Sequence, residues 1–492
     1  MLASWVVEEM KTAELDDKRL NDRLQRLLSD LGAHPTASIP AACGGYAETA
    51  AAYRFFDNAK AGFDNVLQPH IDATRIRIAA QPVVVLVPDT TEVDLTRPEQ
   101  QVEGAGLLDG NSRRGAFLHP MHAFTPDGTP LGTVAANCWT RDHDKLPASS
   151  QSRAQRAATP IEEKESYRWL CSLRQAQAEA NRCPKTQFVF AADSEADIYE
   201  VIAAGMEEPH SIDWIVRACQ DRALEDSAAE TAAAPQRLRA AAAVTPVRYE
   251  QTISVRGREP KVDCDRRSRR QPRQSRTAVV EIRAARVRLR APWRQDKKMP
   301  DVTVNTVLIT EVAPPEGDEP VEWLLITSLP IDTNAHIKLI IDYYCIRWMI
   351  EIFFRTLKSG CRVEERRFQH IDRLLPCLAV YLIVTWRTLY VCRLGRSCPE
   401  MSCEVVFDPS EWQPVYQIVR KQPPPKQPPS LQEMVRMVAQ LGGYVNRKRK
   451  DEPGPQTVWL GLQRLHDIAL CWKTFGPGAH KVGRDPEEAE LM

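Results

Sequence analysis

The side chains in this sequence best spaced for chemistry lie between Tyr344 and Lys358, a stretch that no Pro or Gly interrupts. Apolar residues fill its gaps, and this pattern predicts a helix. At about 100° per residue, one tyrosine, three cations and one carboxylate fall within an arc of roughly 80°. This stripe consists of Tyr344, Arg347, Glu351, Arg355 and Lys358. A solvated row of ion pairs has the same spacing, so the pattern leaves a chemical and a structural role open.

Two further carboxylates each follow a continuous apolar run. The run from Val83 to Val87 precedes Asp89, and the run from Gln187 to Ala192 precedes Asp193. Such runs are typical of strands covered on both faces, and two of them in a helix-covered sheet bring both carboxylates to one edge. An Asp after a strand is often only a helix cap. With Glu351, however, the pair could bind two hard cations roughly 4 Å apart, which activate a water or a 3′-hydroxyl at a phosphodiester.

The surrounding pattern predicts the elements that hold these residues. Residues 1 to about 80 are expected to be helical, with Leu15 to Leu31 at helical spacing and Gly32 ending that helix. A second helix is expected around Tyr46 to Asp57, which carries Arg54. Compact helices of this kind suit a DNA-reading module but are equally common as plain packing. Further on, we expect a hairpin over 115–137 and helices over 166–182 and 194–204.

Residues 205 to about 330 are expected to form an insertion. It contains an Ala-rich helical stretch over 228–243 and two strands over 302–312 and 321–327, the second of which carries Trp323. Between residues 256 and 298 there are 16 Lys and Arg against 5 Asp and Glu. Such a run is often a solvated loop, but basic residues on a hairpin also suit a phosphate backbone.

The C-terminal part is expected to be helical. The apolar run from Leu374 to Trp386 is too short for a bilayer and predicts a core helix that extends to Arg393. A Pro-rich linker precedes a capping-box helix start at Ser430, and a last helix is expected around 458–472. Both tail helices carry apolar stripes that could pair with a second copy or pack on the catalytic domain: Leu431, Met434, Val435, Val438 and Leu441 in the first, and Val458, Leu462, Leu465, Ile468 and Leu470 in the second.

Composition bounds these possibilities. The chain has 492 residues, so two or three domains are expected. Its 65 basic and 65 acidic residues argue against indiscriminate binding to polyanions. The 13 cysteines include no pair at zinc-site spacing, and the N-terminal residues do not resemble a signal peptide. We therefore expect reduced thiols, a cytoplasmic location and no membrane partner.

The spacing Tyr344-x2-Arg347-x3-Glu351-x6-Lys358 resembles the signature of the bacterial cut-and-paste DDE transposases of the IS-four type. Similar segments follow both strands, at Asp89-Thr-Thr and at Asp193-Ser-Glu-Ala-Asp197. Others surround Arg217, Trp323, the segment 440–445 and the N-terminal segments 15–19 and 51–55. The resemblance is therefore nearly full length, and the fixed spacing of its signature is specific.

The resemblance implies an α/β fold with a ribonuclease-H-like core, in which a mixed sheet has flanking helices. It implies that Asp89, Asp193 and Glu351 bind two Mg²⁺ ions, with Mn²⁺ accepted in their place. Tyr344, Arg347 and Lys358 would hold the terminal phosphate of the transposon end. Trp323 would stack on a flipped base, Arg217 would brace the DNA, and Arg355 and Arg54 would also contact it.

The implied domains are a helical DNA-binding domain over 1–80, a catalytic domain over 81–395 with its β-rich insertion at about 205–330, a linker over 396–430, and a helical dimerisation region over 431–492. The implied partners are double-stranded DNA and a second copy of the chain, assembled on DNA at the bacterial nucleoid. The reaction would be metal-dependent cleavage, hairpin formation and opening, and strand transfer. A nuclease without strand transfer and an inactive DNA-binding derivative are the alternatives.

Overall fold

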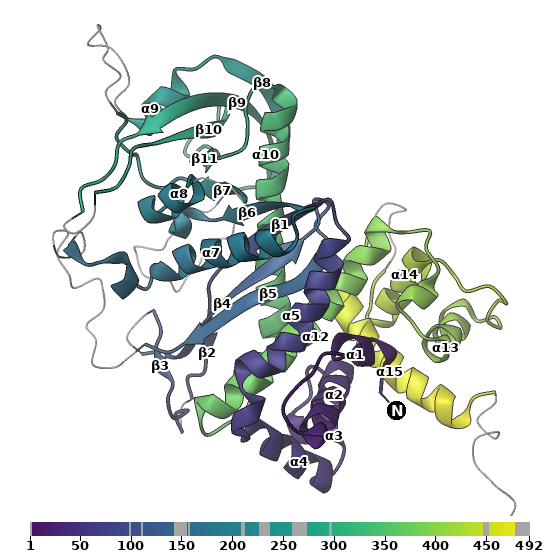
Figure 1. Ribbon diagram of the computed structural model, residues 1–492. Coiled ribbons are helices and arrows are strands. Elements are labelled where there is room, and N and C mark those ends of the chain that lie inside the picture. Colours follow the sequence, from purple (N-terminus) through teal and green to yellow (C-terminus); the bar gives the residue numbers. More distant parts are fainter. Residues whose placement is uncertain are drawn as a thin grey trace, which may run out of the picture. The chain divides into compact units, whose positions relative to one another are not determined.

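The computed structural model describes residues 2–97, 100–109, 112–141, 155, 158–207, 212–225, 237–257, 273–294, 298–445 and 452–477 (Figure 1). The chain divides into two compact units. Unit 1 contains residues 1–81, 90–145 and 348–492, and unit 2 contains residues 82–89 and 146–347. Each unit is therefore built from segments that lie far apart in the sequence.

The N-terminal part of unit 1 is helical, as predicted. In α2, Asp17 caps the first turn by accepting a hydrogen bond from the Arg19 amide. Gly32 does not end α2, contrary to the prediction, because the helix runs on to Ala33. A Cβ at position 32 would come within 3.2 Å of the Trp5 ring, so glycine serves close packing here. The helices are α1 (Ser4–Glu9), α2 (Lys18–Ala33), α3 (Ile39–Cys43), α4 (Tyr46–Phe56) and α5 (Phe63–Ala79).

The predicted hairpin forms the sheet of unit 1. Strands β4 (Arg114–Phe124) and β5 (Pro130–Trp139) pair in antiparallel fashion, and β2 (Thr91–Asp94) and β3 (Gly106–Leu107) pair with β4. Helices α5 and α12 (Ile371–Ser397) pack on β5 (Figure 1). Helix α12 is long and apolar enough to cross a membrane, but 83% of its most apolar window is buried. It is thus the core helix of this unit.

The signature segment is not one continuous helix, which corrects the prediction. Helix α10 (Asn334–Ile346) ends with its C-cap Arg347 in unit 2, and α11 (Trp348–Arg355) begins the last segment of unit 1. A π-helical turn over Thr356–Gly360 follows. The apolar face behaves as expected, because Met349, Ile350, Phe353 and Leu357 are buried.

The remaining helices of unit 1 differ from the predicted linker and tail. The expected linker over 396–430 contains α13 (Pro409–Arg420). Ser430 caps α14 (Leu431–Leu441) as predicted, and α15 (Pro455–Phe475) follows. Both tail stripes are largely buried in one core with α12 and α13, so most of their residues are unavailable to a second copy. This core includes Val391, Cys392, Trp412, Val415, Leu431, Met434, Val435, Val438, Val458 and Leu465.

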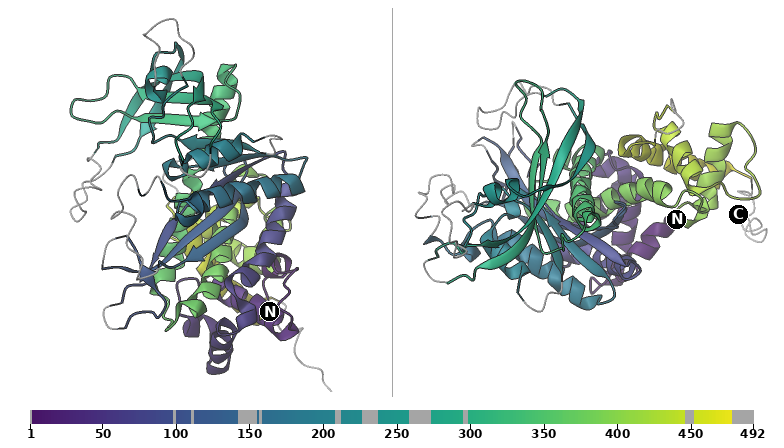
Figure 2. Two further views of the ribbon diagram at one scale, coloured as in Figure 1. Left: turned by 60° about the vertical axis from the view of Figure 1, so that its left-hand side comes forward. Right: turned by 90° about the horizontal axis from the view of Figure 1, so that it is seen from above.

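Unit 2 contains a mixed sheet in the order β1-β6-β7-β11-β10-β9-β8. Figure 2 gives two further views of its strands. The parallel strands are β1 (Val83–Pro88), β6 (Gln187–Ala192) and β7 (Asp213–Arg217). Helices α7 (Tyr167–Arg182) and α10 pack against β1 and β6. Every residue from Val84 to Pro88 is therefore buried, as the continuous apolar run predicted.

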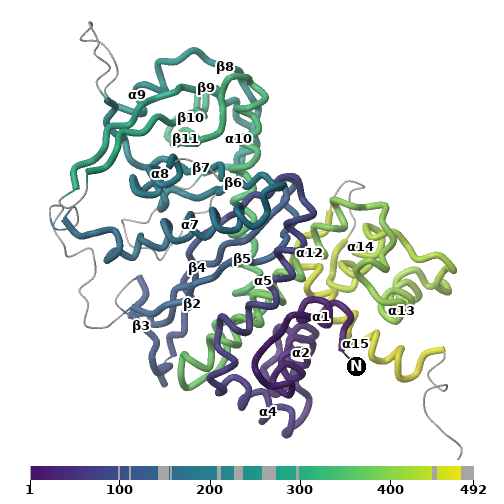
Figure 3. The backbone as a smooth tube through the Cα atoms, viewed as in Figure 1, coloured from purple at the N-terminus to yellow at the C-terminus, as the bar shows by residue number. Residues whose placement is uncertain are grey.

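The insertion supplies the antiparallel part of this sheet, which Figure 3 traces along the chain. Its strands are β8 (Val247–Val255), β9 (Arg276–Leu289), β10 (Val302–Glu311) and β11 (Glu322–Thr327). The predicted Ala-rich helix is reduced to α9 (Leu238–Ala243), and its part over 228–236 lies outside the described residues. The basic core from Arg266 to Arg270 also lies outside them. The expected helix over 194–204 is a short 3₁₀ turn, η4 (Ser194–Ala196), followed by α8 (Tyr199–Gly205).

Candidate active site at the carboxyl ends of β1 and β6

Asp89 and Asp193 follow two adjacent parallel strands. The register pairs Val83 with Gln187 and Leu86 with Phe190, an offset of 104 residues that also separates Asp89 from Asp193. Because the strands are parallel and in register, both carboxylates emerge at the same edge of the sheet. Asp193 also caps η4, since its Oδ1 accepts a hydrogen bond from the Glu195 amide at 2.9 Å.

Arg347 places a positive charge beside the first carboxylate. Its Nη1 lies 3.3 Å from Asp89 Oδ2, and only 7% of the arginine side chain and 15% of the aspartate side chain are exposed. The attraction between opposite charges is stronger when they are shielded from water. The guanidinium therefore shows that the Asp89 carboxylate sits where a cation is favourable.

Tyr344 connects this pair to the rest of the site. It is buried, and burial raises the pKa of its phenol, while Arg347 and Arg217 oppose that rise and Asp193 adds to it. The phenol is thus neutral and can donate a hydrogen bond. Its pKa is influenced by charged residues from three different elements. Its ring lies 5.8 Å from the Trp323 ring in an edge-to-face arrangement.

Two antiparallel strands bring Trp323 and Arg217 into the same neighbourhood. Leu325 of β11 pairs with Arg217 at the end of β7. Arg217 also donates a hydrogen bond to the Glu322 carbonyl at 3.3 Å. Six of the predicted site residues are therefore gathered in unit 2: Asp89, Asp193, Arg217, Trp323, Tyr344 and Arg347.

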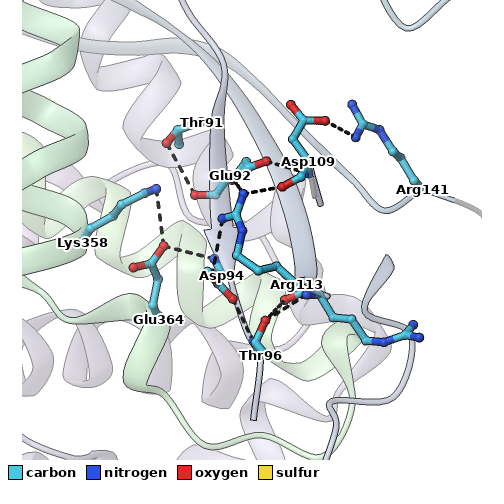
Figure 4. A network of polar contacts seen from close by, with 10 residues as sticks. Thr91, Glu92, Asp94, Thr96, Asp109, Arg113, Arg141, Lys358 and Glu364 are labelled. Atoms are coloured by element: carbon cyan, nitrogen blue, oxygen red, sulfur yellow. Dashed lines mark hydrogen bonds and ion pairs between the residues drawn. The ribbon is translucent and has the colours of Figure 1, made fainter. Parts of the chain in front are cut away.

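The other predicted stripe residues belong to unit 1. Glu351 and Arg355 are exposed on α11, and Lys358 is half-buried in the π-helical turn. Lys358 Nζ lies 3.4 Å from Glu364 Oε1, and the same oxygen accepts the Asp94 amide at 3.0 Å (Figure 4). Sequence reasoning missed Glu364, since nothing in its spacing links it to Asp94.

The Asp94 side of this network is also held by charge, as Figure 4 shows. Burial raises the pKa of Asp94, but hydrogen bonds from Thr96 and the nearby Arg113 outweigh burial and hold it below its usual range. Arg113 also pairs with Glu92 at 2.7 Å. Several carboxylates therefore lie near Lys358, and a phosphate bound to Lys358 would lie close to them.

Arg54 belongs to the helical N-terminal region of unit 1. It is exposed on α4, and its Nε donates to the Ala50 carbonyl at 3.3 Å. Such a side chain is accessible to a nucleic acid, whereas the neighbouring Phe55 and Phe56 are buried and hold the helix in place.

The donor set suits a hard divalent cation, which prefers carboxylate oxygens. Among the residues that the structure describes, no three His, Cys, Asp or Glu side chains converge on one point. Asp89 and Asp193 share an edge within unit 2, while Glu351 belongs to unit 1 and follows Arg347 by four residues along the chain.

Comparison with known proteins identifies the class. Residues 2–61 match the model for a transposase DNA-binding family, residues 176–374 match a transposase DDE domain, and residues 383–473 match the Tn5 transposase dimerisation domain. Among solved structures, the chain has a distant likeness to a piggyBac transposase synaptic complex with hairpin DNA, at 9% identity and a TM-score of 0.33. That alignment covers 68% of this chain and about half, 52%, of the other.

The fold and the three matches define a DDE transposase with a ribonuclease-H-like core and helical flanks. Within that class, the chain belongs to the Tn5-like transposases. This confirms the family and the fold class expected from the sequence. Enzymes with a DDE domain depend on a divalent metal ion, in agreement with the oxygen donors at the strand ends.

Proposed function

We propose that this chain binds the terminal inverted repeats of a DNA element and moves the element by cut-and-paste transposition. The observation that carries the proposal is the pair Asp89 and Asp193, which share one sheet edge beside Arg347, Tyr344 and Arg217 in a Tn5-like chain. Two carboxylates at such an edge can bind the metal ions that cleave a phosphodiester, and the basic side chains around them can hold its phosphate.

In this proposal Asp89, Asp193 and Glu351 are the metal ligands. They would hold two Mg²⁺ ions, and Mn²⁺ would be accepted because it favours similar oxygen ligands. When bound, the ions would activate the attacking hydroxyl and stabilise charge on the leaving oxygen. The ion pair between Arg347 and Asp89 supports this role, because a positive charge already lies beside that carboxylate.

The other site residues would bind and orient the DNA. Tyr344, Arg347 and Lys358 would hold the terminal phosphate of the transposon end, and the neutral phenol of Tyr344 can donate to it. Trp323 is partly exposed beside Tyr344, as a residue that stacks on a flipped base must be. Arg217 would brace the DNA near the cut, and the exposed Arg355 and Arg54 would add backbone contacts.

All steps of the cycle would be one type of phosphoryl transfer. In cleavage a water oxygen attacks phosphorus, and the bond to the 3′-oxygen breaks. In hairpin formation and strand transfer the attacking group is a 3′-hydroxyl, and in hairpin opening it is again water. Each step forms one P–O bond and breaks another, so the same residues can serve all of them.

The proposed partners are the transposon ends, the target DNA and a second copy of the chain. The segment 2–61 would read the ends, and the basic residues around 256–298 would add phosphate contacts. The segment 383–473 would support dimerisation on DNA. With these partners, the working protein would act in the bacterial cytoplasm at the nucleoid.

A direct test uses the purified chain, Mg²⁺ and linear duplexes that end in the inverted repeats flanking its gene. We expect cleavage at the repeat, a hairpin intermediate and joining to a target plasmid. Cutting of the same duplex without joining would favour a nuclease. Specific binding without cutting would favour an inactive derivative.

A further inference from the structure

A second aspartate, Asp197, lies four residues beyond Asp193 and is buried in unit 2. Its Oδ2 accepts the backbone amides of Cys219 at 2.8 Å and Gln220 at 2.7 Å. Its Oδ1 accepts Arg222 Nε at 3.1 Å and Nη2 at 2.5 Å. Four donors on one buried carboxylate make a rigid junction, because an ionised group removed from water requires such partners.

The junction joins the two loops that carry site residues. On one side, η4 runs from its cap at Asp193 to Asp197. On the other side, Cys219 and Gln220 are the second and third residues after β7, which ends at Arg217. A second link crosses the same loops, since Cys219 Sγ donates to the Ser194 carbonyl at 3.3 Å.

The orientation of Asp193 depends on this junction. Asp193 is held through its bond to the Glu195 amide within η4. A 3₁₀ turn of three residues has little stability of its own, so its geometry is set by what fixes its ends. Asp193 fixes one end and Asp197, bonded to the β7 loop and to Arg222, fixes the other.

We propose that Asp197 is a positioning residue for the metal site, which keeps the Asp193 carboxylate and Arg217 in one rigid frame. The inference rests on the proposed metal-binding role of Asp193. Groups that orient a metal ligand typically change metal affinity by about 10- to 100-fold when they are removed. Loss of the junction should therefore weaken metal binding before it weakens DNA binding.

The test is Asp197→Asn in the full chain. Asparagine keeps one acceptor oxygen, but its NH2 group cannot accept the hydrogen bonds from Cys219 and Gln220. The positive charge of Arg222 also loses its negative partner. We expect the affinity for Mn²⁺, measured from the free-ion paramagnetic resonance signal with a repeat duplex bound, to fall at least about tenfold. Duplex binding in a gel-shift assay should change less than about threefold.

The matched control is Glu311→Gln, because Glu311 is another buried carboxylate of unit 2 that bonds an arginine, Arg276, and a backbone amide, that of Val321. It should lower the melting temperature comparably and leave Mn²⁺ affinity unchanged. Equal Mn²⁺ affinities in the two variants would overturn the inference. If Asp197→Asn does not fold, Arg222→Lys keeps the charge without the two-pronged contact, and unchanged Mn²⁺ affinity in it would count equally against the inference.

Asp193→Asn separates this inference from the proposed function. If Asp193→Asn binds Mn²⁺ and cuts normally, the proposed metal ligands are wrong, and the role of Asp197 falls with them. If Asp193→Asn loses both properties while Asp197→Asn behaves like Glu311→Gln, only the role of Asp197 is wrong.

Discussion

Asp193 uses one oxygen to cap η4, and the proposed mechanism assigns its carboxylate charge to a metal ion. Asp193→Asn keeps the cap but removes the charge. We expect the cleavage rate to fall on the order of 10³-fold, since several kcal/mol of transition-state stabilisation are lost. Affinity for the repeat duplex should remain within about threefold in a gel-shift assay. The control is Glu195→Gln, an exposed neighbour that should cut normally. Parallel loss of binding and cutting would contradict the metal-ligand role.

Glu364 forms an ion pair with Lys358, and its carboxylate also accepts a hydrogen bond from the Asp94 amide. Glu364→Gln keeps that hydrogen bond but removes the charge that competes with a phosphate for Lys358. We therefore expect affinity for the repeat duplex to rise about two- to fivefold, as is usual for a partly exposed ion pair. Fluorescence anisotropy at fixed salt measures the change. Glu365→Gln, which removes a more exposed charge beside it, should have a smaller effect. Weaker binding by Glu364→Gln would mean that Glu364 orients Lys358 instead.

At the scale of single elements, the pair of strands that carries the carboxylates could be predicted from sequence, because both runs are continuously apolar and end in Asp. The break at Arg347 and the π-helical turn could not, because 3.6-residue spacing is the same on either side of them. The contacts of Asp197 and Glu364 were also hidden, since their partners lie on other elements. The tail stripes were recognised, but amphipathic spacing does not say which surface covers them.

Strand β4 contains a histidine that makes unit 1 sensitive to acid. Burial lowers the pKa of His122 to about 3, from an ordinary value of 6.5. The unfolded chain therefore takes up a proton below about pH 6.5 that the folded chain refuses, so stability falls as the pH falls from 6.5 toward 3. Between pH 7.5 and pH 5.5 this histidine should cost about 1.4 kcal/mol. Urea unfolding at both pH values should show that His122→Gln removes this part of the loss. An unchanged loss in the variant would contradict the assignment.

The hairpin of β8 and β9 frames the most basic part of the sequence, whose core lies outside the described residues. Replacement of Arg266, Arg267, Arg269 and Arg270 by Ala should flatten the slope of log affinity against log salt by up to about 0.9 for each phosphate that is no longer neutralised. Duplex binding between 50 and about 200 mM salt gives the slope. Replacement of the exposed Lys421 and Lys426 is the control. An unchanged slope in the quadruple variant would mean that these arginines do not contact the DNA phosphates.

At the scale of the whole molecule, a dimer cannot use the buried parts of the tail stripes. The most exposed large apolar side chains of α15 are still available to a partner: Leu470 and Phe475, which are 59% and 80% exposed. We expect Leu470→Glu with Phe475→Glu to bind one repeat end normally but to form at least about tenfold less paired-end complex, because two charges would be buried. Native gels with labelled duplexes separate the two complexes. Ile76→Glu, at an exposed residue of α5, is the control. Normal pairing in the double variant would place the interface elsewhere.

The division of the chain into units also determines the order in which a ribosome can complete them. Unit 2 needs only residues 82–89 and 146–347, whereas the core of unit 1 requires α12 against α2 and α5. At about 5–20 residues per second, the roughly 200 residues of unit 2 take on the order of 10–40 s to synthesise. For at least that time the apolar faces of α2 and α5 lack α12, the helix that packs against them in the folded protein. A nascent chain of this kind gains Glu351 only after its other two candidate metal ligands have been synthesised.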